Sequence, residues 1–352
     1  MIDLNEILKI SIEKKCSNIY LSVGTKIYGR INSNLEVLID KVIDQETVTD
    51  IAKEILLNRF DELETVGDVY KSLSVSGIGR FRINVFKQRN SIGISIKILP
   101  INNCEECKKF SIPAKISEYI YKLNQGLVLV TGPVRSGKST TIANLVENIS
   151  KEKSKYVMSI EAYIEILFKH NKSIVNQREV GSDTETYLSG IESAIRENAD
   201  ILIVDNINNY EVLKMILKCC DSGMLVISSI YSNNVKDSIE SLLNMEQNNN
   251  LYLRNSLANN LRCILNQRII KDNSNEDMCL YETMINTRNI SECIKENKIK
   301  NIPFLIQNSI KLGMCTLDIS LIEAYKSNKI SKEILLKNIS NRELAAKIIL
   351  NY

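Results

Sequence analysis

Residues 126–149 combine three local patterns whose order strongly limits how the chain can fold. A continuous apolar run from Gly126 to Thr131 is followed by a glycine-rich octet and then by helical spacing from Thr140 to Ile149. Strand, turn and helix in this order direct consecutive backbone N–H groups at an anion near the helix N-terminus. The pattern therefore predicts a phosphate-binding loop. Its residues are Gly132, Pro133, Val134, Arg135, Ser136, Gly137, Lys138, Ser139 and Thr140.

The chemistry of this loop suits a nucleoside triphosphate. Lys138 is placed to reach the β- and γ-phosphates, and the Ser139 hydroxyl is placed to ligate Mg²⁺, so ATP and Mg²⁺ are the expected cofactors. Arg135 stands where related loops often have glycine, and a side chain there restricts the backbone. Two interpretations stay open: Arg135 projects into solvent or toward a phosphate in a tolerated geometry, or it weakens the loop.

Further apolar runs predict a buried parallel sheet around the loop. They cover residues 156–160, 199–205 and 224–230 and are separated by segments with helical spacing. Short continuous apolar strands of this kind need helices on both faces, which is typical of an α/β fold. Beyond about residue 250 the sequence is mostly polar, and helical spacing predicts a helical C-terminal part. The expected helices there lie at 251–265, 319–325 and 344–350.

The N-terminal part predicts a second, smaller α/β domain. Apolar residues from Leu4 to Ile12 have helical spacing, whereas residues 19–22 and 79–85 read as short strands. Alternation in the latter strand places Arg80 and Arg82 on one face. A polar stretch with two of the four prolines follows and is interpreted as a linker. The predicted organisation is an N-terminal domain at 1–100, a linker at 101–122, an ATPase core at 123–250 and a C-terminal helical part at 251–352.

Composition excludes several classes of protein. The 352 residues are 44% hydrophobic and 25% charged, as in globular rather than disordered or fibrous chains. A formal charge of only +3 argues against nucleic acid as the main partner. We expect no signal peptide and no apolar stretch of the ~20 residues that cross a bilayer, and hence a cytosolic location. Nine scattered cysteines favour reduced thiols, and Cys104-Glu-Glu-Cys107 is only half of a zinc-binding pattern.

Four separate motifs, supported by a fifth segment near the N-terminus, point to one family. The chain resembles the type IV pilus retraction ATPases, or twitching motility proteins, of the secretion ATPase superfamily, and the resemblance covers nearly its whole length. The matching segments are GLVLVTGPVRSGKSTTIANL at 126–145, VNQREVGSDT at 175–184, AIRENADILIV at 194–204, LGMCTLD at 312–318 and GRFRINVFKQ at 79–88.

The resemblance implies an architecture and a set of partners. It implies a PAS-like N-terminal domain joined by a mobile linker to a RecA-like P-loop ATPase domain, with ATP bound between the two. It also implies a hexameric ring at the cytoplasmic face of the inner membrane. Such a ring contacts a pilus platform protein there, and a related pilus ATPase is a further expected partner.

The resemblance also assigns roles to individual residues. Arg80, Arg82 and Arg196 match arginines that close onto the phosphates, where fixed cations stabilise developing charge. Glu165 matches the glutamate that polarises the attacking water, which makes it the expected general base.

Three positions depart from the family pattern close to the expected γ-phosphate. The acidic segment T-I-E-D-P-I-E reads Ser159-Ile-Glu-Ala162-Tyr-Ile-Glu165, the usual Gly-Glu after the third strand is Asp205-Asn206, and a histidine is replaced by Tyr231. Asp205 could supply the metal ligand that Asn206 cannot, provided that the chain turns there, because adjacent residues of a strand face opposite ways. The single histidine, His170, is expected to be a surface residue.

Two functions follow from these observations. The first is an ATP-hydrolysing motor that retracts a pilus, supported by Lys138, Ser139 and Glu165. The second is a nucleotide-binding, catalytically weak subunit that regulates a pilus or secretion ATPase ring, supported by Ala162, Asn206 and Tyr231.

Overall fold

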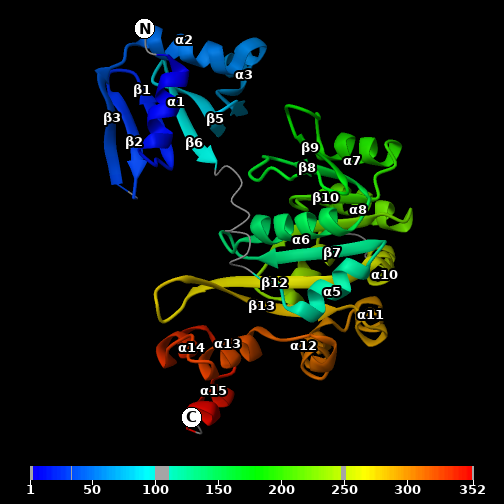
Figure 1. Cartoon of the computed structure of the whole chain (residues 1–352). Helices are drawn as coiled ribbons and strands as arrows, with labels where there is room; N and C mark the ends of the chain where they lie inside the picture. The colour runs from blue at the N-terminus through cyan, green and yellow to red at the C-terminus, as the bar shows by residue number, and fades with distance from the viewer. Residues whose placement is uncertain (1–2, 33, 100–110, 247–250, 351–352) are drawn as a thin grey trace. The chain divides into compact units, whose positions relative to one another are not determined.

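The computed structural model describes residues 3–32, 34–99, 111–246 and 251–350. The chain divides into two compact units (Figure 1). Unit 1 comprises Met1–Asn103 and Tyr163–Leu167, and unit 2 comprises Cys104–Ala162 and Phe168–Tyr352. Cys104 and Cys107, considered above as half of a zinc site, lie outside the described residues.

Unit 1 is built on a six-stranded antiparallel sheet with the order β3-β2-β1-β6-β5-β4. Apolar side chains of its helices pack on the sheet and form one buried cluster, which includes Ile7, Ile51 and Phe81. The strands are β1 (Asn18–Ser22), β2 (Lys26–Ile31), β3 (Asn34–Val42), β4 (Asp68–Val75), β5 (Gly79–Gln88) and β6 (Ser91–Leu99). The helices are α1 (Leu4–Glu13), α2 (Gln45–Leu56), η1 (Leu57–Arg59) and α3 (Glu62–Val66).

Strand β5 confirms the predicted alternation. Phe81 and Ile83 are fully buried, whereas Arg80 and Arg82 are only half-buried on the other face. Period-two burial is what a strand with one face against the core requires, so the local sequence decides which way the arginines point.

Unit 2 contains a seven-stranded sheet with the order β13-β12-β7-β11-β10-β8-β9. All neighbours are parallel except β12 and β13, which form an antiparallel pair. The strands are β7 (Gly126–Gly132), β8 (Tyr156–Glu161), β9 (Ile174–Glu179), β10 (Ile201–Val204), β11 (Leu225–Tyr231), β12 (Leu261–Lys271) and β13 (Asp277–Ile285).

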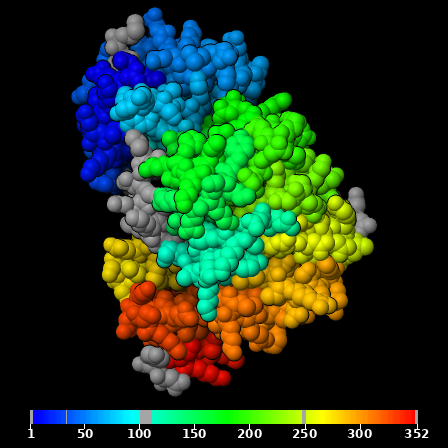
Figure 2. Space-filling model, turned by 45° about the vertical axis from the view of Figure 1, so that its right-hand side comes forward, coloured from blue at the N-terminus to red at the C-terminus, as the bar shows by residue number. Residues whose placement is uncertain are grey.

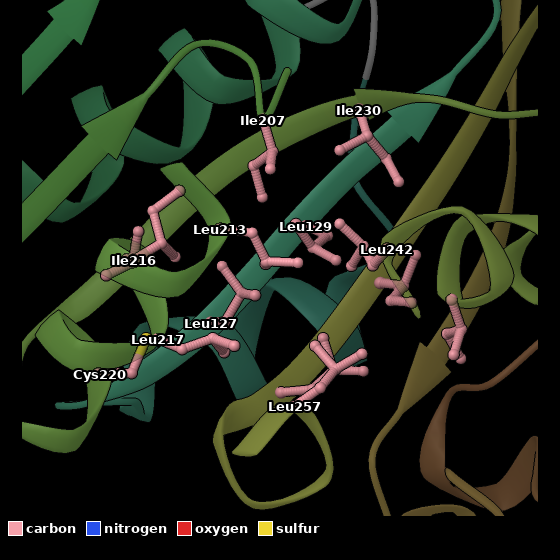
Figure 3. Close-up of a cluster of buried hydrophobic side chains, with 14 of the residues drawn as sticks. Leu127, Leu129, Ile207, Leu213, Ile216, Leu217, Cys220, Ile230, Leu242 and Leu257 are labelled. Carbon is pink, nitrogen blue, oxygen red and sulfur yellow. The ribbon is translucent and has the colours of Figure 1, made fainter. Parts of the chain in front are cut away.

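Helices cover both faces of this sheet. Alternate residues of β7 enter opposite clusters, with Leu127 and Leu129 packing in one and Val128 and Val130 in the other. Figure 3 shows the first cluster, where these leucines meet side chains of α8 and neighbouring helices. The helices of this part are α5 (Ala114–Lys122), α6 (Lys138–Glu152), α7 (Tyr187–Arg196), α8 (Tyr210–Asp221), α9 (Val235–Leu243) and α10 (Leu251–Asn260). The predicted buried sheet is therefore confirmed.

The C-terminal part differs from the prediction in one stretch. The helix expected at 251–265 ends at Asn260, and the chain continues as β12 and then β13. The apolar run Cys263-Ile264-Leu265 is compatible with helix or strand, and pairing with β7 selects the strand.

The remaining C-terminal residues are helical, as predicted, and those after about residue 300 gather in one region of the surface of unit 2 (Figure 2). These elements are α11 (Arg288–Lys295), η2 (Ile299–Asn301), α12 (Ile302–Gln307), η3 (Ile310–Leu312), α13 (Leu317–Lys326), α14 (Lys332–Asn338) and α15 (Arg342–Leu350). Of the helices in the described ranges, none combines the length and the apolar character needed to cross a lipid bilayer.

Candidate functional site

The predicted phosphate-binding loop joins the end of β7 to the start of α6. Glycine is required at Gly132, because an added Cβ would clash with the Gln267 carbonyl and the Ser136 hydroxyl. Gly137 has φ +82°, a left-handed conformation that glycine adopts without strain. Arg135 is left-handed as well, at φ +62°, and its side chain is exposed. The loop thus keeps its shape although Arg135 replaces the glycine usual there, at a small conformational cost.

Buried polar contacts hold the loop from behind. Thr131 Oγ1 accepts hydrogen bonds from Ser238 Oγ (3.0 Å) and Asn266 Nδ2 (2.9 Å), and Gln267 Nε2 donates to the Ser136 carbonyl. These partners come from α9 and β12, more than one hundred residues further along the chain. Buried polar groups are stabilising only when they are paired, so this network favours one loop conformation.

Lys138 lies at the centre of the loop with only neutral contacts among the described residues. Its Nζ donates to the carbonyls of Gly132 (3.1 Å) and Pro133 (2.9 Å) and lies 4.2 Å from the centre of the Tyr231 ring. The residue is 8% exposed, and burial lowers the pKa of its ammonium group to about 8. A buried ammonium without a counter-ion is well suited to receive an anion, and the first turn of the fifteen-residue helix α6 adds backbone donors.

Two other strands of the same sheet, β8 and β10, place acidic residues at their ends. Glu161, the last residue of β8, is buried and accepts hydrogen bonds from Ser159 Oγ (2.6 Å) and Gln177 Nε2 (2.9 Å). Asp205 follows the last residue of β10. Its Oδ1 accepts from the Tyr187 hydroxyl (2.6 Å) and its Oδ2 from the Ala162 N–H (2.9 Å).

The side chains predicted to hold magnesium fit that ion in part by their chemistry. The chain bends at Asp205, as a metal role requires, but both carboxylate oxygens already accept hydrogen bonds. Asn206 Oδ1 is buried and accepts no hydrogen bond from the residues that the structure describes. Ser139 is exposed at the start of α6. A hydroxyl, a carboxylate with remaining lone pairs and an amide oxygen suit a cation that keeps several of its waters.

The predicted arginine face belongs to unit 1, together with the segment that carries Glu165. Arg80 Nε donates to the Ile164 carbonyl (2.9 Å), and the Arg82 guanidinium carbon lies 3.5 Å from the centre of the Tyr163 ring. Lys97 Nζ lies 3.2 Å from Glu165 Oε1, in a pair that is exposed on both sides. Unit 1 therefore brings both arginines to the acidic segment.

Arg196 and His170 belong to unit 2. Arg196 ends α7 and pairs with Glu192 (3.8 Å) and Ser193 (3.2 Å) of its own helix, at the opposite end from Tyr187. Exposed pairs of this kind are weak, so the guanidinium can change partners. His170 is exposed, and its Nδ1 accepts from the Val175 N–H (3.1 Å), as expected of a surface residue.

Comparison with known proteins identifies the family. A model described as "Type II/IV secretion system protein" matches residues 2–302. The chain belongs to this family.

Individual relatives agree with that assignment over most of their length. The type IV pilus retraction ATPase PilT of Pseudomonas aeruginosa is 28% identical over 335 residues, which cover 94% of this chain and 96% of the relative. The protein YggR of Escherichia coli is 26% identical over 321 residues, covering 89% and 95%. A crystal structure of the pilus retraction motor PilT with bound ADP superposes with a TM-score of 0.88 at 32% identity, covering 99% of this chain and 100% of the other. The predicted fold, an N-terminal domain followed by a RecA-like ATPase domain, is confirmed.

The structure shows the contacts of the three residues that depart from the family pattern in the sequence. Ala162 offers only its backbone N–H, which Asp205 binds. Asn206 Oδ1 has no hydrogen-bond partner among the described residues, and the Tyr231 ring faces the Lys138 ammonium. These contacts depend on pairing between strands that are distant in sequence, and the sequence carries no local signal for them.

The burial of Lys138 predicts a pH dependence of nucleotide binding. In the ligand-free protein the ammonium loses its proton around pH 8, whereas bound phosphates stabilise the charged form. Affinity for ADP should therefore be constant below that pH and fall about tenfold for each further pH unit. Calorimetry from about pH 7 to about pH 9.5 measures this. Lys138→Arg, which stays charged throughout, should give a flat profile, and a flat wild-type profile would contradict the prediction.

Proposed function

We propose that the chain binds and hydrolyses ATP as the motor of a type IV pilus system and drives pilus retraction. The observation that carries the proposal is the Gly132–Ser139 loop with its buried, uncompensated Lys138, in a chain similar to a pilus retraction ATPase along nearly its whole length. The domain organisation predicted from the sequence is part of this proposal. So are a hexameric ring, a cytoplasmic position at the inner face of the membrane, contact with a platform protein and association with a related pilus ATPase.

The residues divide into binding and catalytic groups. The backbone of residues 132–140 cradles the phosphates, with Lys138 on the β- and γ-phosphates. Ser139 and Asp205 would hold Mg²⁺, which would neutralise charge on the phosphate oxygens when bound. Glu165 accepts a proton from the attacking water, and Arg80, Arg82 and Arg196 supply positive charge to the transferred phosphoryl group.

A second candidate function is a nucleotide-binding subunit that regulates an ATPase ring without useful turnover. The unpartnered amide oxygen of Asn206 favours it, because an amide carries no charge to hold a divalent cation. Ala162, which contacts Asp205, and Tyr231, which contacts Lys138, add two further departures.

The substitution Asn206→Glu separates the two candidates. If the chain is a motor, the wild type already turns over ATP above the background, and the new carboxylate changes the rate less than about fivefold. If the chain is a weak regulatory subunit, turnover starts near zero and rises roughly 10²- to 10³-fold. Phosphate release by the purified full chain measures both outcomes.

Asn206→Gln is the matched control, because it has the length of glutamate without its charge. A rise that both variants share would show an effect of size. A large rise in Asn206→Glu alone would contradict the motor and support the regulatory subunit.

A further inference from the structure

The loop that carries Glu165 is held at both ends by side chains from neighbouring strands. Residues Tyr163–Leu167 group with unit 1, whereas Ala162 and Phe168 on either side belong to unit 2. The Ala162 N–H donates to Asp205 Oδ2 (2.9 Å), and the Phe168 N–H donates to Gln177 Oε1 (2.8 Å). Glu165 is the midpoint, three residues from each anchor.

Asp205 is itself fixed by two further contacts. Its Oδ1 accepts from the Tyr187 hydroxyl (2.6 Å), and its own N–H donates to the Ile160 carbonyl (3.2 Å). Tyr187 begins α7, whose N-terminus is closed by a reciprocal pair of bonds between Thr186 and Ser189. Because hydrogen bonds to an ionised carboxylate are stronger than neutral ones, the half-buried Asp205 is a firm attachment for Ala162.

Gln177 joins the two ends of the loop to each other. Its Oε1 accepts from Phe168, and its Nε2 donates to Glu161, the residue that precedes Ala162. One amide on β9 thus contacts the chain just before and just after the loop. Fixing both ends of a short segment removes most of the conformations that its middle residue could otherwise visit.

We propose that Asp205 and Gln177 are positioning residues that act on Glu165 through Ala162 and Phe168. Glu165 enters as the general base of the proposed function, so the catalytic part of this inference rests on that function. The anchoring itself does not, because it concerns the conformation of residues 162–168 in the protein without nucleotide.

Hydrogen exchange of residues 162–168 in the nucleotide-free full chain tests the anchoring directly. Asp205→Ala and Gln177→Ala should each raise exchange in this segment about tenfold, because a partly buried bond to the backbone is lost. Asp205→Asn should stay within about threefold of the wild type. Its Oδ1 can still accept from Ala162 while its Nδ2 donates to the Tyr187 oxygen.

Asp200→Ala is a matched control, because Asp200 makes the same kind of bond between β10 and β8 at the opposite end of these two strands. Asp200 Oδ2 accepts from the N–H of Tyr156, the first residue of β8, at 2.9 Å. Its removal should raise exchange around Tyr156 and leave residues 162–168 and ATP turnover unchanged. Exchange at 162–168 that is unaffected by Asp205→Ala, or equally raised by Asp200→Ala, would overturn the inference.

Measuring ATP turnover in these variants tests whether the anchors matter for catalysis. Gln177→Ala, which removes an anchor without altering a proposed metal ligand, should lower kcat about tenfold with unchanged ADP affinity. If Gln177→Ala raises exchange at 162–168 and leaves kcat at the wild-type level, the anchored loop does not position Glu165 and the positioning role fails. If the wild type shows no turnover, the proposed function fails while the exchange result still decides the anchoring.

Discussion

Replacing Lys138 with alanine should weaken binding of ATP and ADP at least about 100-fold and remove ATP turnover. Among the described residues, the Lys138 ammonium is buried in the Gly132–Ser139 loop and contacts only neutral groups, whereas Arg135 of the same loop is exposed, so we expect Lys138 to carry most of the compensation of the phosphate charge. Calorimetry with the intact chain gives the affinity, and phosphate release gives the turnover.

The fold should survive this change. Among the described residues, Lys138 Nζ donates only to the carbonyls of Gly132 and Pro133, both within the loop, so its removal breaks no hydrogen bond to residues outside the loop. Thermal unfolding without nucleotide should therefore match the wild type within a few degrees, whereas the stabilisation by added ADP should disappear. A variant that binds ATP within a fewfold of the wild type would refute the phosphate-binding role. If neither ATP nor ADP binds the wild type, similarity to the retraction motor reflects ancestry alone.

Glu165→Gln should lower kcat roughly 10²- to 10³-fold while ATP affinity changes less than about threefold. The amide has the shape of the carboxylate but cannot accept the proton of the attacking water. The pair with Lys97 is exposed on both sides, so its loss should have little effect on stability. Single-turnover hydrolysis and equilibrium binding on the same preparation separate the two effects.

Lys97→Ala provides the control, since it removes the partner of Glu165 and leaves the carboxylate in place. Turnover in this variant should stay within a fewfold of the wild type. If Glu165→Gln hydrolyses ATP at the wild-type rate, another residue accepts the proton. Equal losses in both variants would point to the ion pair rather than to the base.

Most strands of the unit 2 sheet could be predicted from the sequence, because a strand that is buried on both faces has a continuous apolar run. Gly126–Thr131, the residues of β8 and those of β11 are examples. The sequence did not predict the change from helix α10 to strand β12 after Asn260. No glycine or proline marks that change, and the strand forms because β7, far earlier in the chain, offers an edge to pair with.

Site residues could be named from the sequence more readily than their contacts. Lys138 and Ser139 follow from a local motif, and the half-buried arginine face of β5 follows from alternation. The bond from Ala162 to Asp205 depends on β8 lying beside β10, and the bond from Phe168 to Gln177 depends on β9 lying beside β8. Strand order is a property of the whole sheet, so no short stretch of sequence contains it.

The position of β7 in its sheet has a consequence for biosynthesis. β7 lies between β11 and β12, and the ribosome makes both of these strands after β7. During translation segment 126–132, all of which is buried in the folded protein, therefore has no partner strand until residues 225–231, and then 261–271, have emerged. An unpaired apolar strand is prone to associate with other chains, so we expect the nascent polypeptide to depend on chaperones during that interval. The strands between residues 18 and 99 can complete their own sheet early, whereas ATP has no finished loop to bind until synthesis is well advanced.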